Sequence, residues 1–283
     1  MSEFLITHIG WSKKGQKYLP VLEWFRLDNH EFQKVELDKF KNFDFTKQSS
    51  KKFCIGYYDE LEGKKPCPRL KLIDEKYERC FECEEKNQLK SILFFGKTPT
   101  TQGLKNYFNS EHLVYLAYFE PNILKVGTVN IKRSELRLLE QDAQAYVFIA
   151  RTPNAESAWK LEKYLSKRFG LTTAVQSKTK FSTITLKPNL DKIKTLLNQK
   201  TNEIEKNIDE NYFEFLLTSK NINSFFQNDI IFYPETLPKK MTKASKIKGV
   251  FKGLRGNYLI LESEQNYFAY SKKDLVGYRI SYV

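Results

Sequence analysis

The fold is decided by residues 112–129, which read HLVYLAYFEPNILKVGTV. Apolar and aromatic residues fill 113–119 and again 123–129, and Pro121 and Asn122 between them are turn-forming residues. Two such runs joined by a short turn predict an antiparallel hairpin. We therefore expect two paired strands at the start of the central domain.

The segment that follows the hairpin predicts two helices and one more strand. Helical spacing indicates a short helix over 136–141, and the apolar run 145–150 indicates a third strand. Asn154 can cap a second helix, which we expect over 155–169. The predicted order is therefore strand, strand, helix, strand, helix.

Flanking segments place this core in an α+β protein with further modules on both sides. Within the flanks we expect a strand or helix to begin at Lys90 to Phe95, and we expect residues 96–110 to form a loop. The expected division is an N-terminal β-rich segment at 1–52, a four-cysteine module at 53–111, the core domain at 112–187, and a helical segment with a small C-terminal β unit at 188–283.

Composition favours a polyanionic partner. The net charge is +13 and the isoelectric point is near 9.3, and basic surfaces gain affinity by releasing counterions from phosphates. Aromatic residues make up 14 % of the chain, and exposed rings can stack on bases. No apolar run reaches the roughly 18 residues of a membrane span, and no secretory signal pattern is present. We expect a cytoplasmic location and no membrane partner.

The four cysteines, Cys54, Cys67, Cys80 and Cys83, predict a structural metal site. The last two form a C-x-x-C knuckle that turns two thiolates toward one cation, and four thiolates complete a tetrahedral Zn²⁺ site. Such a site has no open position for catalysis. An iron–sulfur cluster uses the same ligands. Free thiols or disulfides are the remaining alternatives, although disulfides are disfavoured in an intracellular chain.

The helix expected at 155–169 carries a carboxylate within an apolar stripe. One face of this helix presents Ala158, Glu162, Leu165 and Phe169. Burying a carboxylate is costly unless it is paired or binds a cation. Glu162 is therefore a candidate metal ligand, with pairing to an arginine as the alternative.

The predicted hairpin and the helix after it carry two tyrosines, which are most often half-buried core residues, a glycine, and two arginines that can hold a phosphate. Tyr115 and Tyr118 are three positions apart on one strand, so their side chains point to opposite faces. Arg133 and Arg137 are four apart, so they share a helix face from which either can hold a phosphate. Gly127 would allow a ligand to approach the backbone closely.

The arrangement of these motifs resembles the GIY-YIG nuclease superfamily. Val114-Tyr115 is followed about ten residues later by Lys125-Val126-Gly127, and then by an arginine and a helical glutamate. The predicted order of strands and helices matches the core of that superfamily. The resemblance implies an endonuclease that hydrolyses phosphodiester bonds with one divalent metal ion.

The resemblance also implies individual roles. Tyr115 would be the general base that activates water, and Glu162 would hold Mg²⁺ or Mn²⁺. Arg137 would contact a phosphate, with Arg133 as the alternative arginine.

Two positions depart from the superfamily pattern. Leu113 stands where the first motif has glycine, and Lys125 stands where the second motif has tyrosine. Lys125 can instead stabilise a phosphate or developing charge. The residues expected to bind nucleic acid in addition are Lys132, Arg133, Arg151 and Lys160.

A second resemblance covers roughly residues 50–283. It is to a prokaryotic family of unknown function that joins a four-cysteine module to a GIY-YIG-like module. The blocks that carry it are CIG at 54–56, PCP at 66–68, RCFEC at 79–83, HLVYLA at 112–117, KVG at 125–127 and RLLEQDA at 137–143.

Two functions follow as expectations. The first is a metal-dependent endonuclease with a structural zinc module. The alternative is a DNA- or RNA-binding protein that keeps the GIY-YIG-like fold without cleavage, which the two altered motif positions favour. A third, weaker interpretation is an interaction module that binds an acidic protein through its basic surface.

Overall fold

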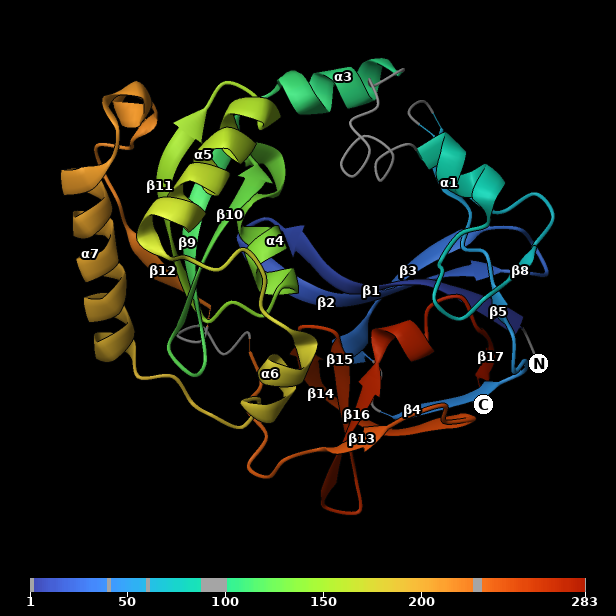
Figure 1. Cartoon of the computed structure of the whole chain (residues 1–283). Coiled ribbons are helices and arrows are strands. Elements are labelled where there is room, and N and C mark those ends of the chain that lie inside the picture. The colour runs from blue at the N-terminus through green and yellow to red at the C-terminus, as the bar shows by residue number, and fades with distance from the viewer. Residues whose placement is uncertain (1–2, 40–41, 60–61, 88–100, 226–230, 283) are drawn as a thin grey trace. The chain divides into compact units, whose positions relative to one another are not determined.

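The computed structural model is of mixed α+β type (Figure 1). Contacts divide the chain into two compact units, the first made of Met1–Leu104 with Pro238–Val283 and the second of Lys105–Leu237. The element expected at Lys90 to Phe95 lies outside the described residues. The residues that the structure describes are 3–39, 42–59, 62–87, 101–225 and 231–282.

The first unit contains a nine-stranded sheet in the order β13-β16-β15-β14-β4-β17-β1-β2-β3. All neighbouring strands are antiparallel except β13 and β16, which are parallel. The bounds are β1 (Glu3–Lys14), β2 (Lys17–Arg26), β3 (Phe32–Glu36), β4 (Phe43–Lys47), β13 (Lys239–Met241), β14 (Lys246–Arg255), β15 (Tyr258–Ser263), β16 (Asn266–Ser271) and β17 (Arg279–Tyr282).

Strand β17 joins sequence-distant parts of the chain in this sheet. Ser281 is the register partner of Glu3 in β1 and of Thr46 in β4, and β14 also pairs with β4. The expected segments 1–52 and 188–283 thus contribute strands to one sheet. Pairing between strands so far apart in sequence has no local pattern from which it could be read.

The cysteines lie in a small part of the first unit, which we call the cysteine module. Its elements are β5 (Lys52–Phe53), β6 (Tyr57–Asp59), β7 (Gly63–Lys65), β8 (Leu72–Ile73) and α1 (Phe81–Asn87). Strand β5 pairs with β8 and β6 with β7. The four cysteines are its buried cluster, with Tyr57 and Ile73 packed against them.

The second unit contains a four-stranded sheet in the order β10-β9-β11-β12, with helices around it. The predicted order of two strands, helix, strand and helix is confirmed. The bounds are β9 (His112–Phe119), β10 (Ile123–Asn130), α4 (Ser134–Glu140), β11 (Ala145–Thr152), α5 (Ala155–Phe169), α6 (Ser177–Ser182), α7 (Leu190–Asn207) and β12 (Ile222–Ser224). Short 3₁₀ helices occur at Leu37–Lys39, Ile131–Arg133, Glu210–Phe215 and Lys272–Asp274.

Helix α3 (Gln102–Asn109) corrects the described part of the loop expected at 96–110, and residues 96–100 of that range lie outside the described residues. Leu104, Tyr107 and Phe108 stand at the helical spacings of three and four. The glycine, serine and asparagine residues around them favour turns and masked this short signal.

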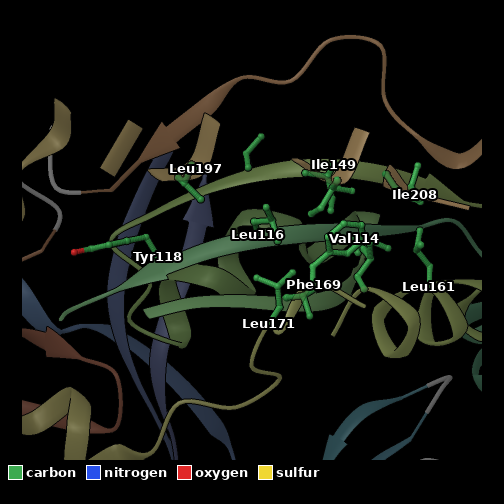
Figure 2. Packing of buried hydrophobic residues seen from close by; sticks show 14 of the residues in the cluster. Val114, Leu116, Tyr118, Ile149, Leu161, Phe169, Leu171, Leu197 and Ile208 are labelled. Atoms are coloured by element: carbon green, nitrogen blue, oxygen red, sulfur yellow. The ribbon is translucent and has the colours of Figure 1, made fainter. Parts of the chain in front are cut away.

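Helices α5 and α7 pack on one face of the four-stranded sheet, where they enclose its apolar core. Figure 2 shows Val114 and Leu116 of β9 in one cluster with Leu161 of α5 and Leu197 of α7. Tyr118 belongs to the same cluster. Tyr115 has the opposite parity on the strand and points to the other face, as predicted.

Among the described residues, no helix combines the length and the apolar character needed to cross a bilayer.

Candidate functional site

Helix α5 positions Glu162 at the edge of its apolar stripe. The Asn154 side chain accepts a hydrogen bond from the Ser157 backbone N–H at 2.9 Å, so the predicted cap is confirmed. Leu161 and Leu165 are fully buried, whereas Glu162 is half-buried. Thr128 of β10 lies close enough to the Glu162 carboxylate to act on its pKa. Burial raises the pKa of this carboxyl, and Thr128 and Lys125 act in the opposite direction.

Tyr115 and Gly127 are register partners on β9 and β10. A Cβ atom placed at Gly127 would lie 2.4 Å from the Tyr115 hydroxyl oxygen and 2.5 Å from its ring carbon Cζ. The Tyr115 ring therefore leaves no room for a side chain at position 127. This corrects the expectation that the glycine leaves room for a ligand to approach the backbone.

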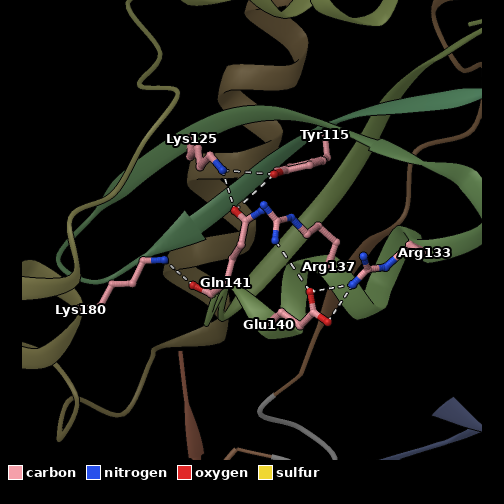
Figure 3. Close-up of polar contacts among 7 residues, drawn as sticks. All are labelled: Tyr115, Lys125, Arg133, Arg137, Glu140, Gln141 and Lys180. Atoms are coloured by element: carbon pink, nitrogen blue, oxygen red, sulfur yellow. Dashed lines mark hydrogen bonds and ion pairs between the residues drawn. The ribbon is translucent and has the colours of Figure 1, made fainter. Parts of the chain in front are cut away.

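Lys125 joins Tyr115 to Gln141, the residue that follows α4, through hydrogen bonds (Figure 3). Its Nζ donates to the Gln141 Oε1 at 2.6 Å and to the Tyr115 hydroxyl at 3.2 Å. Burial lowers the pKa of Lys125 to about 8, and nearby Lys180 adds to the effect. Burial raises the pKa of Tyr115 to about 12. Near neutral pH the phenol keeps its proton, whereas the amine is close to its titration range.

Gln141, Lys180 and Thr128 are site residues that sequence reasoning missed. The Gln141 Oε1 also accepts from the Tyr115 hydroxyl at 3.4 Å, and its backbone carbonyl accepts from Lys180 of α6. Gln141 follows Arg137 by four positions, so their shared helix face could have indicated it. Lys180 comes from a distant segment without a motif, and no sequence signal pointed to it.

Arg137 lies within electrostatic reach of this group. Its positive charge lowers the pKa of both Tyr115 and Lys125. Arg133 donates to both Glu140 carboxylate oxygens, at 2.9 and 3.0 Å, and Arg137 lies 3.8 Å from the same carboxylate. Glu140 thus holds the two predicted arginines side by side (Figure 3).

The structure therefore assembles a set of side chains at the edge strand β10, which we call the β10 cluster. Its members are Tyr115, Lys125, Thr128, Arg137, Gln141, Glu162 and Lys180.

The remaining predicted nucleic-acid-binding residues have other partners. Arg151 pairs with Glu111 at the start of β9, and Lys160 pairs with Glu156 on α5 at 2.7 Å. Lys132 is exposed, and its backbone N–H donates to the Asn130 side chain that begins the turn after β10. These side chains lie on the same unit as the β10 cluster, outside its hydrogen-bond network as given above.

The four cysteine sulfurs form the second candidate site. Their Sγ atoms all lie within 4.8 Å of one another. A tetrahedral ion with Zn–S bonds of about 2.3 Å places its sulfurs about 3.8 Å apart, so the spacing fits such an ion. The backbone N–H groups of Gly56 and Cys80 donate to the Cys54 Sγ at 3.4 and 3.2 Å. Bonds of this kind stabilise ligand thiolates.

Electrostatics also favour a cation at this site. The four cysteines are free and buried. Burial raises the pKa of Cys54 to about 11 and the pKa of Cys83 well above its usual value. Several adjacent thiolates cannot coexist unless positive charge is placed among them. The cysteine module can therefore hold a metal ion such as zinc.

Comparison with known protein families gives a match that covers most of the chain. Residues 96–280 match the model of the family described as protein of unknown function (DUF2797). The chain belongs to this family. The matched stretch covers the whole β10 cluster and begins after the last cysteine, so the expected membership in a family of unknown function is confirmed over residues 96–280. The GIY-YIG-like character of the family stays a prediction. No curated protein and no solved structure matched the chain.

Proposed function

We propose that this protein processes nucleic acid by hydrolysing phosphodiester bonds at the β10 cluster, in a GIY-YIG-like site. The observation that carries the proposal is the environment of Lys125. This amine has a pKa lowered to about 8 and is bonded to the Tyr115 hydroxyl. The same amine interacts electrostatically with the Glu162 carboxylate and the Arg137 guanidinium. A base, a carboxylate and a cation are the groups that phosphodiester hydrolysis uses.

Lys125 is the group in this site that suits proton abstraction. A general base works best when its pKa lies near the working pH. Tyr115 is only 1 % exposed, and its pKa is raised to about 12. Lys125 is partly exposed, and burial lowers its pKa to about 8. We therefore assign the base to Lys125 and a positioning role to Tyr115, in place of the role that the resemblance implied for the tyrosine.

In the proposed step, water attacks phosphorus while Lys125 acts as the base. Neutral Lys125 takes a proton from water, and the water oxygen forms a bond to phosphorus. The bond from phosphorus to the leaving oxygen breaks, and that oxygen takes a proton from solvent. Arg137 offsets the negative charge that builds on the phosphate oxygens.

Glu162 fits a divalent metal ligand in this scheme. Magnesium in phosphate-handling sites is often held by one or two carboxylates together with waters and phosphate oxygens. Glu162 offers one carboxylate whose pKa is raised by burial, and a nearby cation relieves such a burial cost. Bound Mg²⁺ or Mn²⁺ would neutralise charge on the phosphate.

The cysteine module is proposed to hold a structural Zn²⁺. The buried cluster of this segment consists of the four cysteines. A metal–thiolate centre would therefore replace the apolar core that so short a segment lacks.

A cleavage assay tests the proposal. Purified full-length protein is incubated with Mg²⁺ or Mn²⁺ and a panel of single-stranded, double-stranded and branched DNA and RNA. We expect Glu162→Gln and Lys125→Arg to lose cleavage, because arginine keeps the charge but cannot act as a base. Glu156→Gln is the matched control, since Glu156 is an exposed carboxylate on the same helix. Equal cleavage by wild type and Glu162→Gln would refute the assigned site.

One observation favours the second candidate function, binding without cleavage. Gln141 already satisfies Lys125 at 2.6 Å, and Tyr115 is closed off from solvent. Salt-dependent binding of nucleic acid with no product on the whole panel would select this function.

A further inference from the structure

An aromatic surface lies beside the β10 cluster and has no role in the chemistry proposed above. Trp159 of α5 packs edge-on against Phe108 of α3, with ring centroids 5.6 Å apart. Phe108 in turn contacts Tyr107, and Tyr107 contacts His112, at 5.3 and 5.5 Å. We call Tyr107, Phe108 and Trp159 the aromatic ledge.

Two of the three rings of the ledge are exposed although they are large. Trp159 is 37 % exposed and Tyr107 is 39 % exposed, and the half-buried Phe108 lies between them. The other two tryptophans, Trp11 and Trp24, are 5 % and 6 % exposed. Single exposed rings are ordinary on a surface, but two exposed rings bridged by a third are typical of binding surfaces.

Polar contacts hold the ledge in place. The Asn130 side chain at the end of β10 donates to the Ser110 hydroxyl at 2.7 Å and to the Tyr107 carbonyl at 3.4 Å. His112 contacts the Ser110 carbonyl through Nδ1 at 2.8 Å. These bonds tie the end of α3 to the sheet, so the rings are positioned before any ligand binds.

The ledge continues the two elements that hold Glu162. Trp159 precedes Glu162 by three residues on α5, which is about one helical turn. Asn130 follows Thr128, which lies near Glu162, by two residues on β10. A ligand on the ledge therefore lies next to the β10 cluster.

The charges around the ledge suit a phosphate-bearing ligand. Lys160 and Lys163 are exposed beside Trp159 on α5, and Lys132 is exposed just beyond Asn130. Over residues 105–237, however, acidic residues nearly balance lysine and arginine. We therefore expect stacking to add to the affinity that the local lysines supply through counterion release.

We propose that the aromatic ledge stacks unpaired bases, so that the nucleic acid bound by this unit is single-stranded where it meets α3 and α5. Every base has a flat face that an aromatic ring can contact, whereas paired bases within a duplex keep these faces covered. The inference rests on the proposed function only in taking nucleic acid as the ligand.

Tryptophan fluorescence tests the proposal directly. Full-length protein is titrated, without added Mg²⁺ or Mn²⁺, with an oligothymidylate of about 12 nucleotides and with the matching duplex. Because Trp159 is the exposed tryptophan among three, we expect the single strand to quench emission and the duplex to leave it nearly unchanged. In Trp159→Phe the quenching disappears while single-strand binding persists. In Trp159→Ala single-strand binding weakens about tenfold.

The outcomes separate this proposal from the proposed function. Binding of the single strand without quenching, or equal affinity of wild type and Trp159→Ala at unchanged thermal stability, overturns the ledge and leaves the cleavage proposal standing. Quenching that persists in Glu162→Gln supports the ledge whatever that variant does to cleavage. Tyr107→Ala is the second variant, and it should weaken single-strand binding without changing duplex binding. Absence of binding to either form overturns both proposals.

Discussion

The ring of Tyr115 occupies the space that a side chain at Gly127 would fill, with its hydroxyl oxygen 2.4 Å from the position of a Cβ atom there. The two residues are direct partners across β9 and β10. Tyr115 is fully buried, so it cannot swing into solvent to make room. The glycine of this motif is therefore explained by packing against the neighbouring strand.

Gly127→Ala should lower the free energy of unfolding by about 1–3 kcal/mol, because the added methyl group overpacks this contact. Denaturant unfolding of wild type and variant measures the loss. In a Tyr115→Ala background the same change should cost little, since the ring is gone. An equal cost in both backgrounds would contradict the contact as the cause.

Lys125 should make stability depend on pH in a defined window. Its pKa is about 8 in the folded protein and near 10.4 when unfolded. Between these values the unfolded chain binds a proton that the folded chain does not, so this contribution to stability rises with pH. This rise in the free energy of unfolding applies up to about pH 10. Above that pH Tyr115 loses its proton in the unfolded chain but keeps it in the folded chain, and this lowers stability as pH rises.

Urea unfolding of wild type and Lys125→Met at several pH values measures this effect. Between pH 7 and pH 10 the free energy of unfolding of wild type should rise by about 1 kcal/mol relative to that of Lys125→Met. This value is reduced for the partial exposure of Lys125. The free energy of unfolding of Lys125→Arg should show no such rise relative to Lys125→Met, because arginine stays charged throughout. A difference that is constant with pH would refute the lowered pKa.

Arg137 and Arg151 form a matched pair for testing the β10 cluster. Their side chains are 53 % and 50 % exposed, and each contacts one carboxylate. Arg137→Ala should reduce cleavage by about 100-fold, as expected for loss of a group that stabilises the transition state. Arg151→Ala should reduce it only slightly. Initial rates under matched conditions compare the two, and similar losses would argue against a special role for Arg137.

Cys80→Ser should remove the metal from the cysteine module. Metal analysis should find about one equivalent of zinc in wild type and well under half an equivalent in the variant, with a lower melting temperature. Phe81→Ala is the control, because its side chain is 77 % exposed in the same knuckle. Iron in place of zinc would identify the alternative cluster, and a metal-free wild type would exclude a constitutive site.

Local pattern was sufficient to predict the hairpin, α4, β11 and α5. Each is a run with one clear period, and the cap at Asn154 marks a helix start without tertiary information. The position of β17 between β1 and β4 could not be predicted in this way. The choice of partner strand depends on contacts between residues hundreds of positions apart, and alternation along a strand does not encode it.

The candidate site was predictable where a residue belongs to a motif. Tyr115, Lys125, Arg137 and Glu162 were named from the resemblance to the GIY-YIG motifs, and the structure places them within electrostatic reach of one another. Lys180 and Thr128 were not, because their roles arise from the approach of α6 and from the position of α5 over the edge strand. The network through Gln141 likewise requires distances that only the folded chain provides.

The central position of β17 has a consequence for the order of folding during synthesis. Strands β1 and β4 leave the ribosome early, but the strand that must lie between them is made after the whole of residues 105–237. The second unit can therefore fold while β1 and β4 still lack the strand that pairs with them. Nascent chains that stall before β17 would expose these unpaired strand edges, which favour aggregation, so we expect such chains to bind chaperones.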